Sequence, residues 1–80
     1  MHGPTPDIFD EPNYVLVVAE IDGLTRDDVH LELHDDILTL VAEQGDVKFR
    51  SEILLPGIFT ADRMSYACRN GVLEIRLAKS

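Results

Sequence analysis

The chain has 80 residues, a net charge of -8, 45% hydrophobic residues and a single cysteine. That length accommodates one small domain with a compact core. The negative charge argues against binding to nucleic acid, whose phosphates it would repel. One cysteine cannot form an internal disulfide, so packing and backbone hydrogen bonds must hold the fold. The apolar runs are far shorter than the ~20 residues of a membrane-spanning helix, and we expect a cytoplasmic protein without membrane contact.

The acidic residues are concentrated in the first half of the chain. Residues 1 to 40 carry ten acidic side chains and one basic side chain, Arg26, whereas residues 41 to 80 carry five and six. The acids stand singly or in pairs between apolar residues, as on a solvated polar face. Near the start, Pro4 and Pro6 predict a flexible segment over residues 1–6, with the ordered domain covering residues 7–80.

Hydrophobic periodicity predicts β-strands along the whole chain. Ile8 and Phe9 indicate a short first strand, and residues 14–19 are apolar at every position, which favours a central strand or one with neighbours on both faces. In residues 29–34 apolar and polar side chains alternate, so Val29, Leu31 and Leu33 share one face. Further strands are predicted over residues 37–43, 49–55, 64–68 and 72–78.

The residues between these strands are typical of tight turns. Asn70-Gly71 is a strong hairpin signal because both residues tolerate a positive φ. Asp35-Asp36 and Gly45-Asp46 predict two further two-residue turns, and Thr25 followed by Asp28 predicts a capped helical turn. Residues 60–63 suggest another such turn. The pattern predicts an all-β fold, an antiparallel β-sandwich of six to eight short strands.

The sequence offers little for catalysis. His30 and His34 share a strand face but lie about 13 Å apart, too far for one metal ion with ligands at ~2 Å. His34 with Asp35 or Asp36 is a remote metal candidate, which a solvated strand end explains equally well. Cys68 is a remote redox candidate, and we interpret it as a small apolar filler. We therefore expect no enzyme, no cofactor and no metal site.

Three segments together resemble the small heat shock protein family, whose members carry the Hsp20 or α-crystallin domain. Residues 14–29 are similar to the family's strand and short acidic turn, and residues 29–43 to its paired strands. The third segment is Leu54-Leu-Pro56 followed by residues 64–73. It ends in the family's signature turn, Asn70, Gly71, Val72 and Leu73. The resemblance covers residues 7–79 and implies an immunoglobulin-like sandwich.

The sequence also departs from the family pattern. Tyr66 stands where a small alanine is common. In oligomeric bacterial and archaeal members, a long excursion with an extra strand, exchanged between two subunits, lies where this chain has Gln44-Gly-Asp46. The resemblance thus implies a minimal form without the exchange strand, N-terminal arm or C-terminal anchor. We expect a monomer or a weak dimer rather than a large cage.

Two functions follow from the resemblance. The first is an ATP-independent chaperone or chaperone-like module that holds extended or apolar segments of unfolding proteins. The alternative is an interaction domain with one specific protein partner and no holdase activity. It would be comparable to co-chaperone sandwich domains or to Hsp20-like domains serving an ArsA-type ATPase or gas-vesicle assembly.

The resemblance also implies a peptide groove between two strand edges. Its candidate residues are Leu31, Leu33, Met64, Tyr66 and Ala67. Periodicity alone explains Leu31 and Leu33 equally well as core residues. The sequence does not decide which face of residues 64–68 points inward. Met64, Tyr66 and Cys68 are the more apolar set, whereas Ser65 and Ala67 suit a groove that another chain approaches closely.

Overall fold

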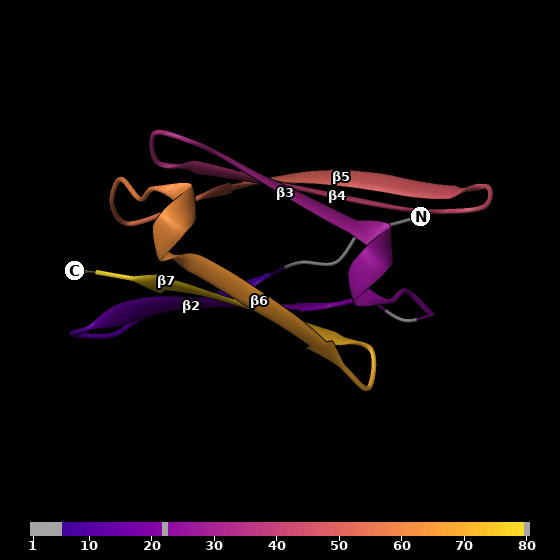
Figure 1. Ribbon diagram of the computed structural model, residues 1–80, viewed down its shortest axis with the longest axis horizontal. Helices are drawn as coiled ribbons and strands as arrows, with labels where there is room; N and C mark the ends of the chain where they lie inside the picture. Colours follow the sequence, from indigo (N-terminus) through magenta and orange to yellow (C-terminus); the bar gives the residue numbers. More distant parts are fainter. Residues whose placement is uncertain (1–5, 22, 80) are drawn as a thin grey trace.

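The computed structural model describes residues 6–21 and 23–79 and shows two antiparallel sheets packed face to face (Figure 1). One sheet has the order β1 (Asp7–Asp10), β2 (Tyr14–Glu20), β7 (Val72–Ala78), β6 (Met64–Arg69). The other has the order β3 (Val29–His34), β4 (Ile37–Gln44), β5 (Val47–Leu54). These seven strands confirm the predicted all-β sandwich. Of the segment predicted to be flexible, residues 1–5 lie outside the described residues.

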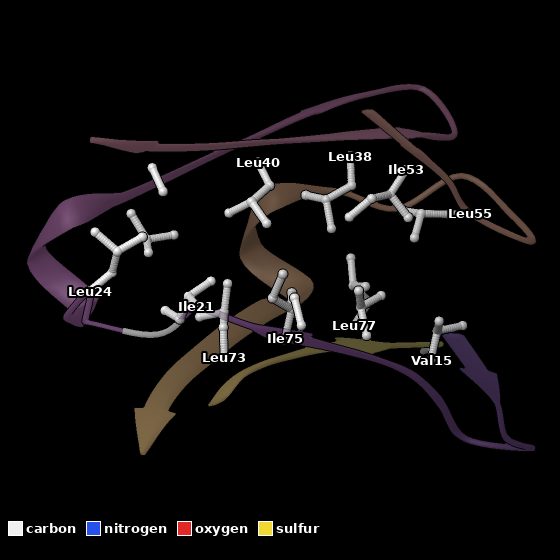
Figure 2. Close-up of a cluster of buried hydrophobic side chains, with 14 residues drawn as sticks. Val15, Ile21, Leu24, Leu38, Leu40, Ile53, Leu55, Leu73, Ile75 and Leu77 are labelled. Carbon is white, nitrogen blue, oxygen red and sulfur yellow. The ribbon is translucent and has the colours of Figure 1, made fainter. Parts of the chain in front are cut away.

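The core lies between the two sheets, and all the buried residues of the described chain are apolar. On β2, Val15, Val17 and Ala19 are buried, and each stands opposite a buried residue of β7. Figure 2 shows Leu38 and Leu40 of β4 pointing across the sandwich towards Ile75 and Leu77 of β7. The same cluster includes other buried side chains: Ile21, Leu24, Val29, Ala42, Ile53, Leu55 and Leu73. Burial of alternate residues from both sheets is what holds the two layers together.

The uniform apolar run in β2 belongs to a strand that lies inside its sheet. β2 is central in its sheet, as predicted, because it pairs with both β1 and β7. However, only its alternate residues are buried, and Leu16 and Val18 are half-buried on the outer face. Of the two alternatives predicted for this run, the central strand is therefore the one that the described residues form. Leu16 instead has Phe9 of β1 as its cross-strand neighbour on that outer face.

The three predicted two-residue turns are confirmed, and each uses a positive φ. Asn70 and Gly71 have φ of 50° and 76° and connect β6 directly to β7. Asp35 has φ of 56° between β3 and β4, and Gly45 has φ of 59° between β4 and β5. β4 and β5 pair without interruption from Ile37 opposite Leu54 to Gln44 opposite Val47.

The predicted turns before β3 and β6 are single 3-10 turns, η1 (Arg26–Asp28) and η2 (Ala61–Arg63). In η1 the Asp28 carboxylate accepts hydrogen bonds from the Thr25 backbone N–H at 2.9 Å and from the Thr25 hydroxyl at 3.2 Å. It also accepts one from Gln44 Nε2 at 2.9 Å, which connects the start of β3 to the end of β4. Asp28 therefore fixes where β3 enters its sheet.

Replacing Asp28 with alanine is expected to lower the free energy of unfolding by about 1 kcal/mol, because the cap loses all three bonds. Urea unfolding of both proteins would measure the difference. Asp27→Ala is the matched control, since Asp27 is an exposed residue of the same turn. Equal midpoints for the two variants would show that the Asp28 bonds contribute nothing to stability.

Candidate functional site

The candidate site lies along β3 and β6, which are edge strands of the two sheets. Both strands lie on the near side of the sandwich in Figure 1. In β3, Leu31 and Leu33 stand opposite the buried Leu40 and Leu38 of β4, so they face the interior. Four of the inward apolar residues on these two strands are only half-buried and pack against the core. We call the set Leu31, Leu33, Met64 and Tyr66 the β3–β6 edge.

The pairing of β6 with β7 settles which face of β6 points inward. Met64, Tyr66 and Cys68 stand opposite Leu77, Ile75 and Leu73, all of which are fully buried. The more apolar set of the two considered from sequence therefore faces the core.

Ser65 and Ala67 point the other way, where they stand opposite Arg76 and Glu74 of β7. There they line a shallow hollow of about 330 Å³ on the outer face of the sheet. Ala67 is consequently misplaced among the predicted groove residues, because strand alternation puts it on the opposite side from Met64 and Tyr66.

One end of the β3–β6 edge is closed by contacts from the segment that leads into β3. The Arg26 guanidinium lies 4.5 Å from the centre of the Tyr66 ring, in a cation–π arrangement, and its Nε donates to the Tyr66 carbonyl at 3.4 Å. The Cys68 thiol donates to the Leu24 carbonyl at 3.7 Å. These contacts bind β6 to the loop before β3.

Arg26 was not among the residues predicted for the site. The available signal was its position as the single basic residue among ten acidic ones in residues 1 to 40. In this contact the guanidinium covers one face of the Tyr66 ring.

The chemistry of the β3–β6 edge suits binding rather than catalysis. Its side chains are two aliphatic leucines, the thioether of Met64 and the phenol of Tyr66. They belong to two strands whose outer backbone edges have no partner strand among the described residues. An extended peptide can hydrogen-bond to such an edge while its alternate side chains contact the half-buried apolar residues. The geometry therefore fits an extended segment with apolar side chains.

The titratable residues considered from sequence are dispersed. His30 and His34 are exposed on the outer face of β3, and His34 Nε2 lies 3.7 Å from Asp35 Oδ2 at the turn. Within residues 6–21 and 23–79, no three His, Cys, Asp or Glu side chains come together as metal ligands would.

A hydrogen bond from the Thr60 hydroxyl lowers the pKa of Asp62 in η2, at the entry to β6. In the described part of the chain, no helix has the length and apolar content needed to cross a membrane.

Comparison with solved structures identifies the fold. The structure is similar to hspA from Xanthomonas axonopodis, with a TM-score of 0.85 and 26% identity over 99% of this chain and 95% of that one. It is similar to heat shock protein 16.0 from Schizosaccharomyces pombe, with a TM-score of 0.83 and 23% identity over 99% and 88% of the two chains. A mutant of hsp14.1 from Sulfolobus solfataricus gives a TM-score of 0.85 and 26% identity over 95% and 74%. No protein-family model and no curated protein matches the sequence.

These likenesses show that the chain has the α-crystallin-domain fold of small heat shock proteins. They confirm the fold that residues 14–29, 29–43 and 64–73 imply by resemblance. Asn70 to Leu73, the signature turn, form the tight connection into β7, where Leu73 is fully buried.

Proposed function

We propose that this domain is an ATP-independent, chaperone-like module that holds extended or apolar segments of unfolding proteins along the β3–β6 edge. The observation that carries the proposal is the presence of half-buried apolar side chains on the inward faces of the two open edge strands, Leu31 and Leu33 on β3 and Met64 and Tyr66 on β6. The likeness of the fold to small heat shock proteins supports it. The proposed activity needs no metal, cofactor or nucleotide, and we place it in the cytoplasm.

Suppression of aggregation of a heat-labile test protein would test this proposal. The Leu33→Ser variant is expected to suppress aggregation several-fold less than the unmodified domain, because it removes apolar contact area from the edge. Leu54→Ser is the matched control, since Leu54 is 65% exposed and its partner in the sheet is Ile37, on the outer face. Urea midpoints of both variants would separate lost binding from lost folding.

Two outcomes of this assay would contradict the proposal. One is equal suppression by the Leu33→Ser variant, the Leu54→Ser variant and the unmodified domain, which would place binding elsewhere. The other is suppression that appears only when ATP is added, because no step of edge binding consumes a nucleotide.

A second candidate function is a specific interaction domain without holdase activity. The observation that favours it is the direct connection of β4 to β5 through Gly45 and Asp46, which leaves no strand there to exchange with a second subunit. We propose on this basis a monomer or weak dimer. Light scattering at several concentrations would give a monomer mass that rises at most towards that of a dimer, and purification with bound proteins would enrich one partner. A large assembly that binds many unfolding proteins would exclude this candidate.

A further inference from the structure

A second open edge lies at β1, on the outside of the four-stranded sheet. β1 pairs only with β2 among the described residues, through four register pairs from Asp7 opposite Val18 to Asp10 opposite Val15. It presents two adjacent large apolar residues, Ile8 and Phe9, which are 41% and 48% exposed. An edge strand with exposed apolar residues is a template for pairing with another extended chain.

The two apolar residues of β1 point to opposite faces of the sheet. Ile8 stands opposite Val17, whose side chain is buried in the core, and Phe9 stands opposite Leu16 on the outer face. A strand added at β1 would therefore meet one apolar residue on each face. Two adjacent apolar residues in the added strand would make both cross-strand contacts at once.

Carboxylates stand on either side of this apolar pair. Asp7 and Asp10 bracket Ile8 and Phe9, and Glu11 follows directly. Lys79 Nζ lies 2.6 Å from Asp10 Oδ1 in an exposed ion pair that offsets only part of the Asp10 charge, whereas no ion pair joins Asp7 to a described residue. The edge is thus apolar at its centre and acidic at its ends, in the half of the chain that carries ten of the fifteen acidic residues.

These charges disfavour pairing of β1 with a second copy of itself. If the four residues of β1 pair antiparallel with the same four residues of a second copy, Asp7 of each copy lies opposite Asp10 of the other. A shift of one residue that places Phe9 opposite Phe9 brings Asp7 opposite Glu11 instead. Like charges directly opposite each other destabilise strand pairing, whereas opposite charges stabilise it. The complementary occupant is a different, positively charged strand.

We infer that the β1 edge binds an extended segment of a partner protein in which two adjacent apolar residues are flanked by lysine or arginine. The added strand hydrogen-bonds to the open side of β1, its apolar residues contact Ile8 and Phe9, and its basic residues pair with Asp7 and Asp10. This inference goes beyond the proposed function, because it names a second edge and the class of segment that this edge binds.

Two labelled hexapeptides would test this inference by fluorescence anisotropy at low salt. Both contain isoleucine and valine at the centre, flanked by lysines in one and by glutamates in the other. We expect the lysine peptide to bind the unmodified domain about tenfold more tightly, since each peptide end gains or loses one cross-strand charge pair. In the Asp7→Lys variant the preference is expected to fall several-fold.

The matched control is Asp46→Lys, which changes the net charge equally but lies in the exposed β4–β5 turn. This variant is expected to keep most of the tenfold preference. The inference is overturned if the unmodified domain binds both peptides equally. It is also overturned if Asp46→Lys reduces the preference as much as Asp7→Lys, because the overall charge would then explain it.

Failure of this inference is distinguishable from failure of the proposed function. If Leu33→Ser abolishes binding of the lysine peptide and Asp7→Lys has no effect, the β3–β6 edge holds the peptide and the β1 inference is wrong. If the Asp7 variant loses the preference while the unmodified domain fails to suppress aggregation, the β1 edge stands and the chaperone function is wrong.

Discussion

Replacing Leu40 with alanine is expected to destabilise the domain by about 2–5 kcal/mol, because the deletion leaves a cavity between the sheets. Leu40 is 0% exposed and stands on β4, the central strand of its sheet. Small domains have a total stability of about 5–15 kcal/mol, so the variant is expected to lose a large share of it. Urea unfolding followed by circular dichroism would measure the loss.

The control for this variant is Leu54→Ala, which makes the same chemical change on the outer face of the same sheet. Leu54 is 65% exposed, so its truncation is expected to alter the free energy of unfolding by less than about 0.5 kcal/mol. A loss of the same size in both variants would contradict the sandwich, because it would mean that the two leucines share one environment.

The Gly71→Ala variant is expected to lose about 1–2 kcal/mol, since an L-residue with a side chain is strained in the left-handed region. Gly71 has φ of 76° in the hairpin between β6 and β7, and its carbonyl accepts a hydrogen bond from the Ile21 N–H at 2.7 Å. Strain at this position would therefore be felt both in the hairpin and at the end of β2. Thermal unfolding would report the loss as a lower Tm.

Gly57→Ala is the matched control for this glycine. Gly57 is not among the positive-φ glycines, and an added Cβ would approach no closer than 3.6 Å, an ordinary contact with the Phe59 ring. We expect its stability to be unchanged or slightly raised, because alanine restricts the unfolded chain. If both alanine variants had the same Tm, the left-handed conformation of Gly71 would not contribute to the fold.

Local patterns in the sequence predict the strands and turns of this domain well. Asn70-Gly71 and Gly45-Asp46 specify tight hairpins through residues that accept positive φ, and the structure confirms both. The alternation in residues 29–34 correctly places Leu31 and Leu33 on the inward face of β3. Short-range stereochemistry and a period of two are sufficient for these predictions.

Properties that depend on which strands are neighbours could not be predicted from these patterns. An apolar run such as residues 14–19 does not reveal whether a second layer covers its outer face, and in β2 none does among the described residues. The choice between Tyr66 and Ala67 depended on the register with β7, a pairing that local alternation cannot supply. Likewise, the partial exposure of Leu31 and Leu33 follows from the position of β3 at a sheet edge.

Hydrogen–deuterium exchange with a bound apolar peptide tests the central claim most directly. The peptide would be extended, uncharged and rich in leucine, and exchange would be followed at individual amides without ATP. The proposed function predicts added protection in β3 and β6, around Leu31, Leu33, Met64 and Tyr66, with little change in the β4–β5 hairpin. Binding that protects other strands and leaves β3 and β6 unchanged would contradict the β3–β6 edge as the site at which this domain holds its clients.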